Sequence, residues 1–87
     1  ESYVLYQNYP NPFNPVTTIQ CNIPNATDLQ ITVYDLLGKK LDVLFSGYAA
    51  PGQYQFQWDA SRYSSGMYFV RMVTPEYSAI QKLTLLK

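Results

Sequence analysis

The chain has 87 residues, of which 47% are hydrophobic and only 14% are charged, and its formal net charge at neutral pH is zero. This length suits one domain with one core, and the six scattered Lys and Arg residues exclude both nucleic-acid binding by counterion release and binding to an anionic membrane surface. The apolar runs are too short for a transmembrane helix and no signal peptide opens the chain, so we expect a piece of a longer exported protein.

The first element in chain order is a proline-rich opening segment over residues 1–15. Three prolines lie within residues 9–15, and each fixes its own φ and pushes the preceding residue toward an extended conformation. We therefore predict a stiff segment that does not pair as a central strand. Phe13 is a candidate anchor for plugging one end of the fold, while Asn11 and Asn14 bond to the local backbone. The segment is either a rigid lid over the first strand or an exposed element that a receptor recognises.

Alternation of apolar and polar residues with period two then predicts two strands. In residues 18–23 the apolar side chains share one face, which includes Cys21, the single cysteine, and we expect this thiol to be buried. Residues 29–34 form the next strand. Residues 35–38 are predicted to be a tight turn in which Gly38 takes a positive φ.

A third strand and a loop follow the turn. The strand is expected to direct Leu41, Val43 and Phe45 toward the core, with Leu44 marking a bulge or the strand's end. Residues 47–52 are predicted to be a loop because they end in a Pro-Gly turn signal.

The clearest alternation lies in the second half of the chain. Inward positions are expected at Tyr54, Phe56, Trp58, Tyr68, Val70, Met72, Leu83 and Leu85, on strands separated by a polar connection and a Pro-Glu turn. The aromatic residues around Trp58 are assigned to the core, with a sugar-stacking platform as the alternative. Six to seven short, mostly antiparallel strands predict an all-β, immunoglobulin-like β-sandwich, which we expect to be one domain over residues 1–87.

Catalytic and metal-binding side chains are scarce. The chain has no histidine, and its six acidic residues lie mostly at turns and strand ends, where carboxylates accept hydrogen bonds from backbone N–H groups. No spacing indicates a carboxylate pair or a phosphate-binding loop, so we expect no enzyme activity, no cofactor and no metal site. Calcium held by turn aspartates stays open as an alternative, although the spacing of a dedicated calcium loop is missing.

Five short motifs occur in an order that resembles a known family. They are residues 9–15 followed by Thr17-Thr18-Ile19, residues 33–39, the pair Trp58-Asp59, residues 65–71 and the closing residues 82–87. From about Leu5 to the last residue, the chain resembles the C-terminal sorting domain of the type IX secretion system. It also resembles the related immunoglobulin-like module of flagellar hook-capping proteins.

The resemblance implies a role, partners and a set of residues. Such domains follow exported passengers of Bacteroidetes-like bacteria and direct them through the type IX translocon to the cell surface, where a sortase-like protease often removes the domain. They have no activity themselves. The residues carried over for recognition and sorting are Asn11, Pro12, Phe13, Asn14, Pro15, Gly38, Gly66, Lys82, Leu83, Leu85, Leu86 and Lys87. Lys39 stands where the family commonly has arginine, and Ala60 where glycine or asparagine is frequent.

The closing strand suggests how the translocon reads the domain. A strand that ends in Leu85-Leu86-Lys87 is expected to present an unpaired edge that another strand extends by backbone pairing. Two other functions stay open. One is a self-assembling extracellular fibre subunit that donates residues 3–7 to a neighbour's sheet edge, and the other is a carbohydrate-binding or spacer module of a secreted hydrolase.

Overall fold

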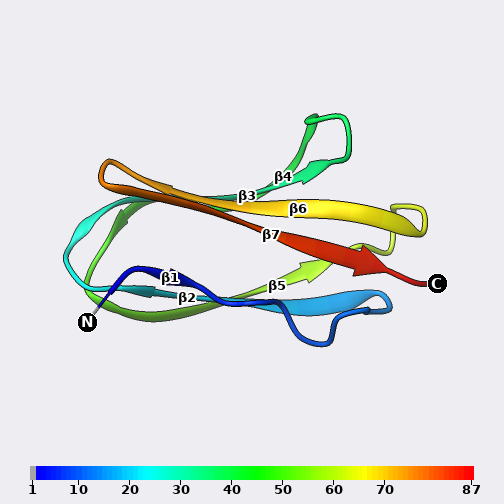
Figure 1. The fold of residues 1–87 in the computed structure, drawn as a ribbon, viewed down its shortest axis with the longest axis horizontal. Coiled ribbons are helices and arrows are strands. Elements are labelled where there is room, and N and C mark those ends of the chain that lie inside the picture. Colours follow the sequence, from blue (N-terminus) through cyan, green and yellow to red (C-terminus); the bar gives the residue numbers. More distant parts are fainter. Residues whose placement is uncertain (1) are drawn as a thin grey trace.

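The computed structural model describes residues 2–87, which form seven strands packed as two layers (Figure 1). The strands are β1 (Val4–Leu5), β2 (Val16–Ile23), β3 (Thr27–Asp35), β4 (Lys40–Ala49), β5 (Gly52–Asp59), β6 (Gly66–Thr74) and β7 (Tyr77–Leu85). None of the described residues lies in a helix, and no helix long and apolar enough to cross a membrane is found among them. The predicted all-β fold with six to seven strands is confirmed.

The strands make two antiparallel sheets that face each other. One sheet has three strands in the order β1-β2-β5, and the other has four in the order β4-β3-β6-β7. The molecule extends 37 × 23 × 15 Å along its principal axes. The first described residues and the C-terminus lie at opposite ends of the long axis (Figure 1), so the two ends of the domain are separated by most of its length.

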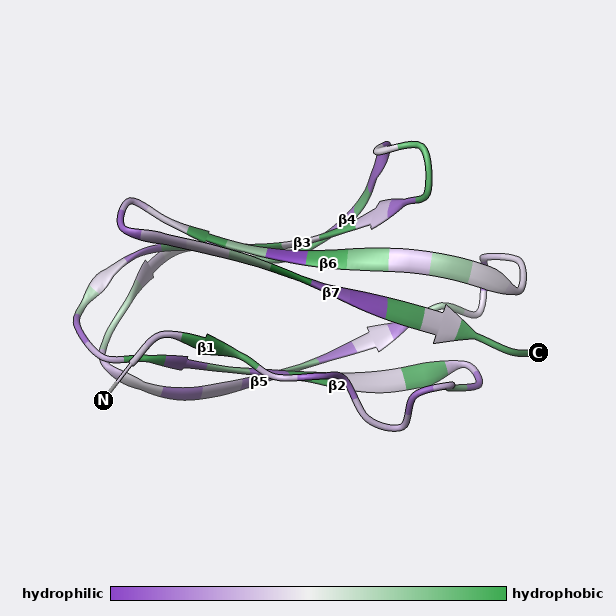
Figure 2. Cartoon of the chain, viewed as in Figure 1, coloured by the Kyte–Doolittle hydropathy of each residue, from purple (hydrophilic) through white to green (hydrophobic). Residues whose placement is uncertain are grey.

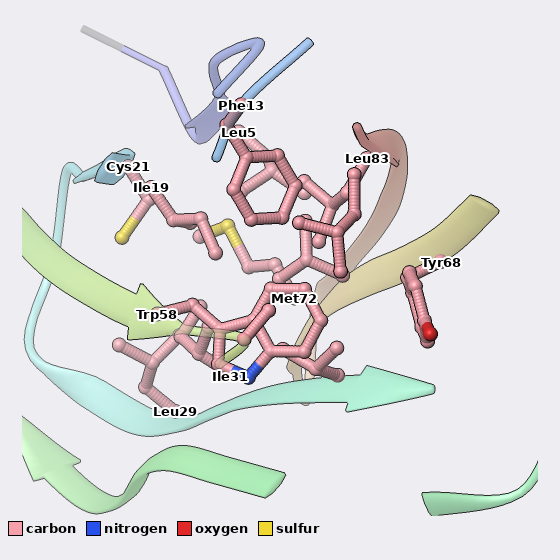
Figure 3. Close-up of a cluster of buried hydrophobic side chains, with 14 of the residues drawn as sticks. Leu5, Phe13, Ile19, Cys21, Leu29, Ile31, Trp58, Tyr68, Met72 and Leu83 are labelled. Carbon is pink, nitrogen blue, oxygen red and sulfur yellow. The ribbon is translucent and has the colours of Figure 1, made fainter. Parts of the chain in front are cut away.

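The core lies between the sheets and follows the predicted alternation. On β2, Ile19, Cys21 and Ile23 are fully buried. Figure 3 shows the first two of these in one cluster with Ile31 and Met72, which come from the opposite sheet. Burial raises the pKa of the Cys21 thiol to about 11, because a thiolate is poorly solvated there. The prediction of a buried cysteine is confirmed.

The aromatic alternation on β5 also ends in the core. Trp58 is only 2% exposed, while Tyr54 and Phe56 are partly buried and lie 6.4 and 5.8 Å from Phe45 between ring centroids. The core assignment of this strand is confirmed. An indole buried between two sheets does not offer a face to a saccharide, so Trp58 cannot be part of a sugar-stacking platform.

β4 departs from the predicted pattern at two positions. Its register with β3 skips Leu41 and Leu44, so each is an extra residue that interrupts the period-two alternation. The bulge expected at Leu44 is therefore confirmed. The inward assignment of Val43 is wrong, because the bulges turn this side chain to the outer face of the sheet, where it is 51% exposed.

The predicted loop over residues 47–52 is also wrong in extent. β4 continues to Ala49 and β5 begins at Gly52, so only Ala50 and Pro51 connect the two strands. The Pro-Gly signal marks the turn correctly, but both strands run up to it because their backbone groups pair almost to the end.

The opening segment contains a short strand that the sequence pattern did not predict. Val4 pairs with Asn22 and Leu5 with Cys21, and the Leu5 side chain is buried in the core. Residues 3–7 are the segment that the fibre hypothesis would donate to a neighbouring subunit. Because Val4 and Leu5 already pair with β2 and the Tyr6 N–H donates to the Gln20 carbonyl, the structure argues against that donation.

Candidate functional site at the C-terminal pole

Most of the predicted recognition residues gather at the end of the sandwich where the chain terminates (Figure 1). Three segments meet there: the proline-rich loop over residues 11–15, the connection from β5 into β6 over residues 60–66, and the closing residues 82–87. We call these three segments the C-terminal pole.

Phe13 fills the core at this pole. Its side chain is 2% exposed, and its ring lies 5.7 Å from the Trp58 ring between centroids. Figure 3 shows the Phe13 ring beside Leu5 of one sheet and Leu83 of the other. The predicted plug at one end of the fold is confirmed, and this single ring contacts both layers.

The backbone of Phe13 is bound to the closing strand. Its N–H donates to the Thr84 carbonyl at 3.0 Å, and its carbonyl accepts from the Leu86 N–H at 3.0 Å, which makes a short parallel bridge. The Asn11 side-chain carbonyl accepts a further bond from the Thr84 N–H at 3.1 Å. We call these three hydrogen bonds the clasp.

The clasp corrects the expectation of a free terminal edge. The backbone groups of Thr84 and Leu86 that a second strand would need are already bonded to the opening segment, and Gln7 Nε2 donates to the Lys82 carbonyl at 2.9 Å. The expected unpaired edge at the very end of the chain is therefore wrong. Within residues 2–87, the uncovered stretch of the β7 edge lies earlier, around Ile80.

A buried polar pair sets the shape of the proline-rich loop. Asn8 is 2% exposed, and its Nδ2 donates to Thr17 Oγ1 at 2.9 Å and to the Pro10 carbonyl at 3.2 Å. Thr17 Oγ1 donates to the same carbonyl at 2.9 Å. These bonds hold a stretch of chain whose prolines have no N–H to place in a ladder. No sequence pattern predicted a role for Asn8, and Thr17 was noted only as part of the Thr17-Thr18-Ile19 motif.

Lys87 binds the connection between β5 and β6. Its backbone N–H donates to Ser65 Oγ at 2.9 Å, and its Nζ donates to the Ser61 carbonyl at 2.7 Å. The same connection is tied to the proline-rich loop, because the Ala60 N–H donates to the Pro15 carbonyl at 2.9 Å. All three segments of the pole are thus hydrogen-bonded to one another.

The acidic residue at this connection is committed to the local turn. Asp59 Oδ1 accepts hydrogen bonds from the Ser61 N–H at 2.9 Å and from the Ser61 hydroxyl. These bonds lower the pKa of the Asp59 carboxyl. No group of three or more His, Cys, Asp or Glu side chains suited to a metal ion occurs in the described part of the chain.

A second acidic residue, which sequence reasoning missed, supports the pole from β4. Asp42 Oδ2 accepts from Trp58 Nε1 at 2.8 Å and from the Tyr63 hydroxyl at 3.1 Å, and Oδ1 lies 3.5 Å from an Arg62 guanidinium nitrogen. Burial raises the pKa of the Tyr63 hydroxyl, and the Asp42 carboxylate raises it further. The available signal was the buried tryptophan, because an indole N–H in a core needs an acceptor.

The two predicted glycines occupy different places. Gly66 begins β6 opposite Leu85 and belongs to the pole. Gly38 lies in the turn between β3 and β4 with a φ of 88°, and its N–H donates to the Asp35 carbonyl at 3.0 Å. The positive φ predicted for Gly38 is confirmed, but the clasp does not include this turn.

The predicted residues of the pole divide into supporting and presented side chains. Phe13, Leu83 and Leu85 are buried and hold the segments in place. Pro15 is half-buried, and the exposed side chains are Asn11, Pro12, Asn14, Lys82, Leu86 and Lys87. The exposed side chains of the pole therefore include both apolar and basic groups.

Comparisons with known proteins give one family and a common fold. The profile of the family described as "Secretion system C-terminal sorting domain" matches residues 7–85. Latent dimeric PorU from Porphyromonas gingivalis is similar in structure, with a TM-score of 0.67 and 18% identity over 97% of this chain and 9% of that one. No curated protein matches the chain.

Two further solved structures are similar over nearly their whole lengths. The first immunoglobulin domain of mouse SynCAM 2 has a TM-score of 0.51 at 11% identity and is covered over 94% of its chain. CopC from Methylosinus trichosporium OB3b has a TM-score of 0.52 at 14% identity and is covered over 93%. Each comparison covers 97% of this chain. At such identities these structures show the fold, and the immunoglobulin-like β-sandwich is confirmed.

The family match shows more than a common fold, because the family profile spans almost the entire chain. It includes the proline-rich loop, both predicted glycines and β7 through Leu85. The motif resemblance is therefore confirmed. This chain belongs to the secretion-system C-terminal sorting domains, which are sorting signals for type IX secretion.

Proposed function

We propose that this domain is a non-catalytic signal whose C-terminal pole is read by the type IX translocon. The observation that carries the proposal is the clasp, because it joins two sequence motifs into one surface. Asn11 and Thr84, which it connects, are 73 positions apart in the chain. A receptor that binds this surface recognises the folded domain, since an unfolded chain does not hold the two motifs together.

The side chains presented at the pole suit recognition by another protein. Leu86 is 56% exposed at the tip, and Lys82 and Lys87 of the same closing segment are also exposed. An apolar side chain flanked by charges gives a partner both buried area and orientation. Asn14 and Pro12 extend the same surface from the proline-rich loop.

The position of the other end of the domain fits an upstream passenger. The first described residues lie at the far end of the 37 Å axis from the pole (Figure 1). A passenger joined there leaves the pole accessible to the secretion machinery. On this proposal the translocon is the first partner, a sortase-like protease is the second, and the passenger is delivered to the cell surface.

The test is secretion of a fluorescent passenger fused to residues 1–87 in a bacterium with a type IX system. Deletion of residues 82–87 should leave the passenger in the periplasm. That deletion also removes the clasp, so a milder variant is needed. Leu86→Asn combined with Lys87→Gln changes the presented tip while leaving every backbone bond of the clasp available, and it should also reduce surface delivery.

The matched control is Tyr48→Asn, which changes a 71% exposed side chain on β4 outside the pole. This variant should be secreted normally. Intrinsic fluorescence of Trp58 in each purified domain checks that it is folded. Normal surface delivery by a folded tip variant would contradict the proposal that the pole is read.

Self-association through edge strands is a second candidate with a narrower basis. The uncovered part of the β7 edge surrounds Ile80, which is 59% exposed. An exposed edge with an apolar side chain can pair with another chain. Light scattering over a wide concentration range tests this candidate, and a monomer at every concentration would exclude it.

A further inference from the structure

The turn between β3 and β4 rises from the outer face of the four-stranded sheet (Figure 1). A groove lies between this turn and the sheet. The groove has a volume of about 300 Å³. Its walls include Tyr34, Leu36 and Gly38 on the turn side and Phe69, Arg71 and Ile80 on the sheet side. This is a concave surface of the size that holds one or two inserted side chains.

The strand register explains why these side chains meet. Tyr34 pairs with Phe69, which pairs with Lys82, and the next outward row across the sheet places Arg71 beside Ile80. Phe69 is half-buried and Ile80 is 59% exposed, so apolar surface remains open in a hollow. Exposed apolar surface in a concave, polar-rimmed site is typical of an interaction site.

The turn adds a second exposed apolar element. Leu36 is 61% exposed and Leu37 is 94% exposed, and Figure 2 shows hydrophobic colouring at this turn, far from the core. Asp35 Oδ1 accepts from the Leu37 N–H and the Lys39 N–H, both at 2.9 Å. The Asp35 carboxylate, which lines the groove, is therefore engaged in holding the turn.

The groove is bordered by most of the chain's positive charge. Two of the six basic residues are bonded at the pole, since Arg62 pairs with Asp42 and the Lys87 ammonium binds a carbonyl. The other four are Lys39 and Lys40 at the turn and Arg71 and Lys82 on the outer face of the sheet. Within residues 2–87, no salt bridge involves any of these four.

We propose that this groove binds an acidic, apolar peptide segment of another protein. A carboxylate of the segment binds the Arg71 guanidinium, whose planar fork matches two carboxylate oxygens, and an adjacent apolar side chain packs between Phe69 and Ile80. The hollow shape favours an inserted peptide side chain over a flat lipid surface. The residues that line the groove lie outside the clasp, and only Lys82 at its border is shared with the pole, so this proposal can be tested separately from how the pole is read.

The test is a titration of the ¹⁵N-labelled chain with a synthetic ten-residue peptide of alternating Glu and Leu or Phe, followed by NMR. Chemical shifts of residues 36–40, 69–71 and 80 should move. Arg71→Gln should weaken binding about tenfold, the loss expected for a hydrogen-bonded charge pair. Arg62→Gln is the matched control, because it removes the same charge outside the groove, and it should bind within about twofold of the unaltered chain.

Several results would overturn the proposal. A peptide with Gln in place of every Glu should bind much more weakly, and equal binding would show that charge does not contribute to recognition. Chemical-shift changes elsewhere in the chain, or unchanged affinity in Arg71→Gln, would show that the groove is not the binding site. Concentration-dependent shifts of the same residues without peptide would assign the groove to a second copy of this chain. Binding to anionic phosphatidylserine vesicles but not to the peptide would assign it to a membrane.

Discussion

Phe13→Ala is the substitution that tests most directly whether the proline-rich loop holds the fold together. The ring is 2% exposed, contacts Trp58 and lies between the two sheets, so its removal leaves a cavity at the pole. Truncation of a buried phenylalanine costs about 3–5 kcal/mol. The free energy of unfolding of such domains is about 5–15 kcal/mol, and each kcal/mol of lost stability lowers the Tm by roughly 4–8 °C. We therefore expect Phe13→Ala to lower the Tm by at least about 12 °C.

Urea unfolding measures the loss in free energy and thermal unfolding the loss in Tm, with far-ultraviolet circular dichroism and Trp58 fluorescence as two probes of each transition. Trp58 is the single tryptophan and lies against the substituted ring, so its emission reports the pole itself. Leu37→Ala is the control, because it removes an apolar side chain that is 94% exposed and should change stability by less than about 0.5 kcal/mol. A loss below about 1 kcal/mol in Phe13→Ala would refute the plug.

Three further predictions concern single residues away from the clasp. Asp42→Ala leaves the Trp58 indole N–H and the Tyr63 hydroxyl without their acceptor, so urea unfolding should show a loss of about 1–3 kcal/mol. The pKa of Cys21 in the folded chain, about 11, exceeds its ordinary value of 9.0, so the stabilisation from its protonated thiol is lost as pH rises from about 9 to about 11. Cys21→Ala should therefore flatten the dependence of the free energy of unfolding on pH over that range. Gly38→Ala places a side chain at a φ of 88° with no neighbouring atom to clash, so thermal unfolding should show a loss of about 1–2 kcal/mol from backbone strain alone.

Sequence patterning succeeded where a strand has one buried face and no irregularity. β2 alternates cleanly, and its inward residues Ile19, Cys21 and Ile23 are all fully buried. On β4 the same rule failed at Val43, because two bulges within one strand shift the alternation twice. A bulge is set by how a strand fits its neighbour and by twist, and neither is visible in the residues of one strand.

The candidate site was also predicted only in part from the sequence. Motif resemblance identified residues 11–15 and 82–87, but it did not predict that they are bonded to each other. The clasp consists of backbone groups plus the Asn11 amide, and backbone hydrogen bonds have no side-chain signature in the sequence. Asn8 was missed for a related reason. A buried asparagine is identified by its partners, and these are brought to it by the folded loop.

The opening segment performs two tasks with one set of bonds. β7 is an edge strand, and an uncovered edge is a template for pairing with any other chain, including a neighbouring copy or an attached passenger. The clasp and the Gln7 amide occupy the second half of that edge, from Lys82 to Leu86, which is also the half that carries the closing motif. Covering the edge with residues 7–13 therefore protects the strand and fixes the motif in one conformation. On the proposal that the translocon reads the pole, this surface exists only after both ends of the domain have folded together, so its receptor would select folded chains.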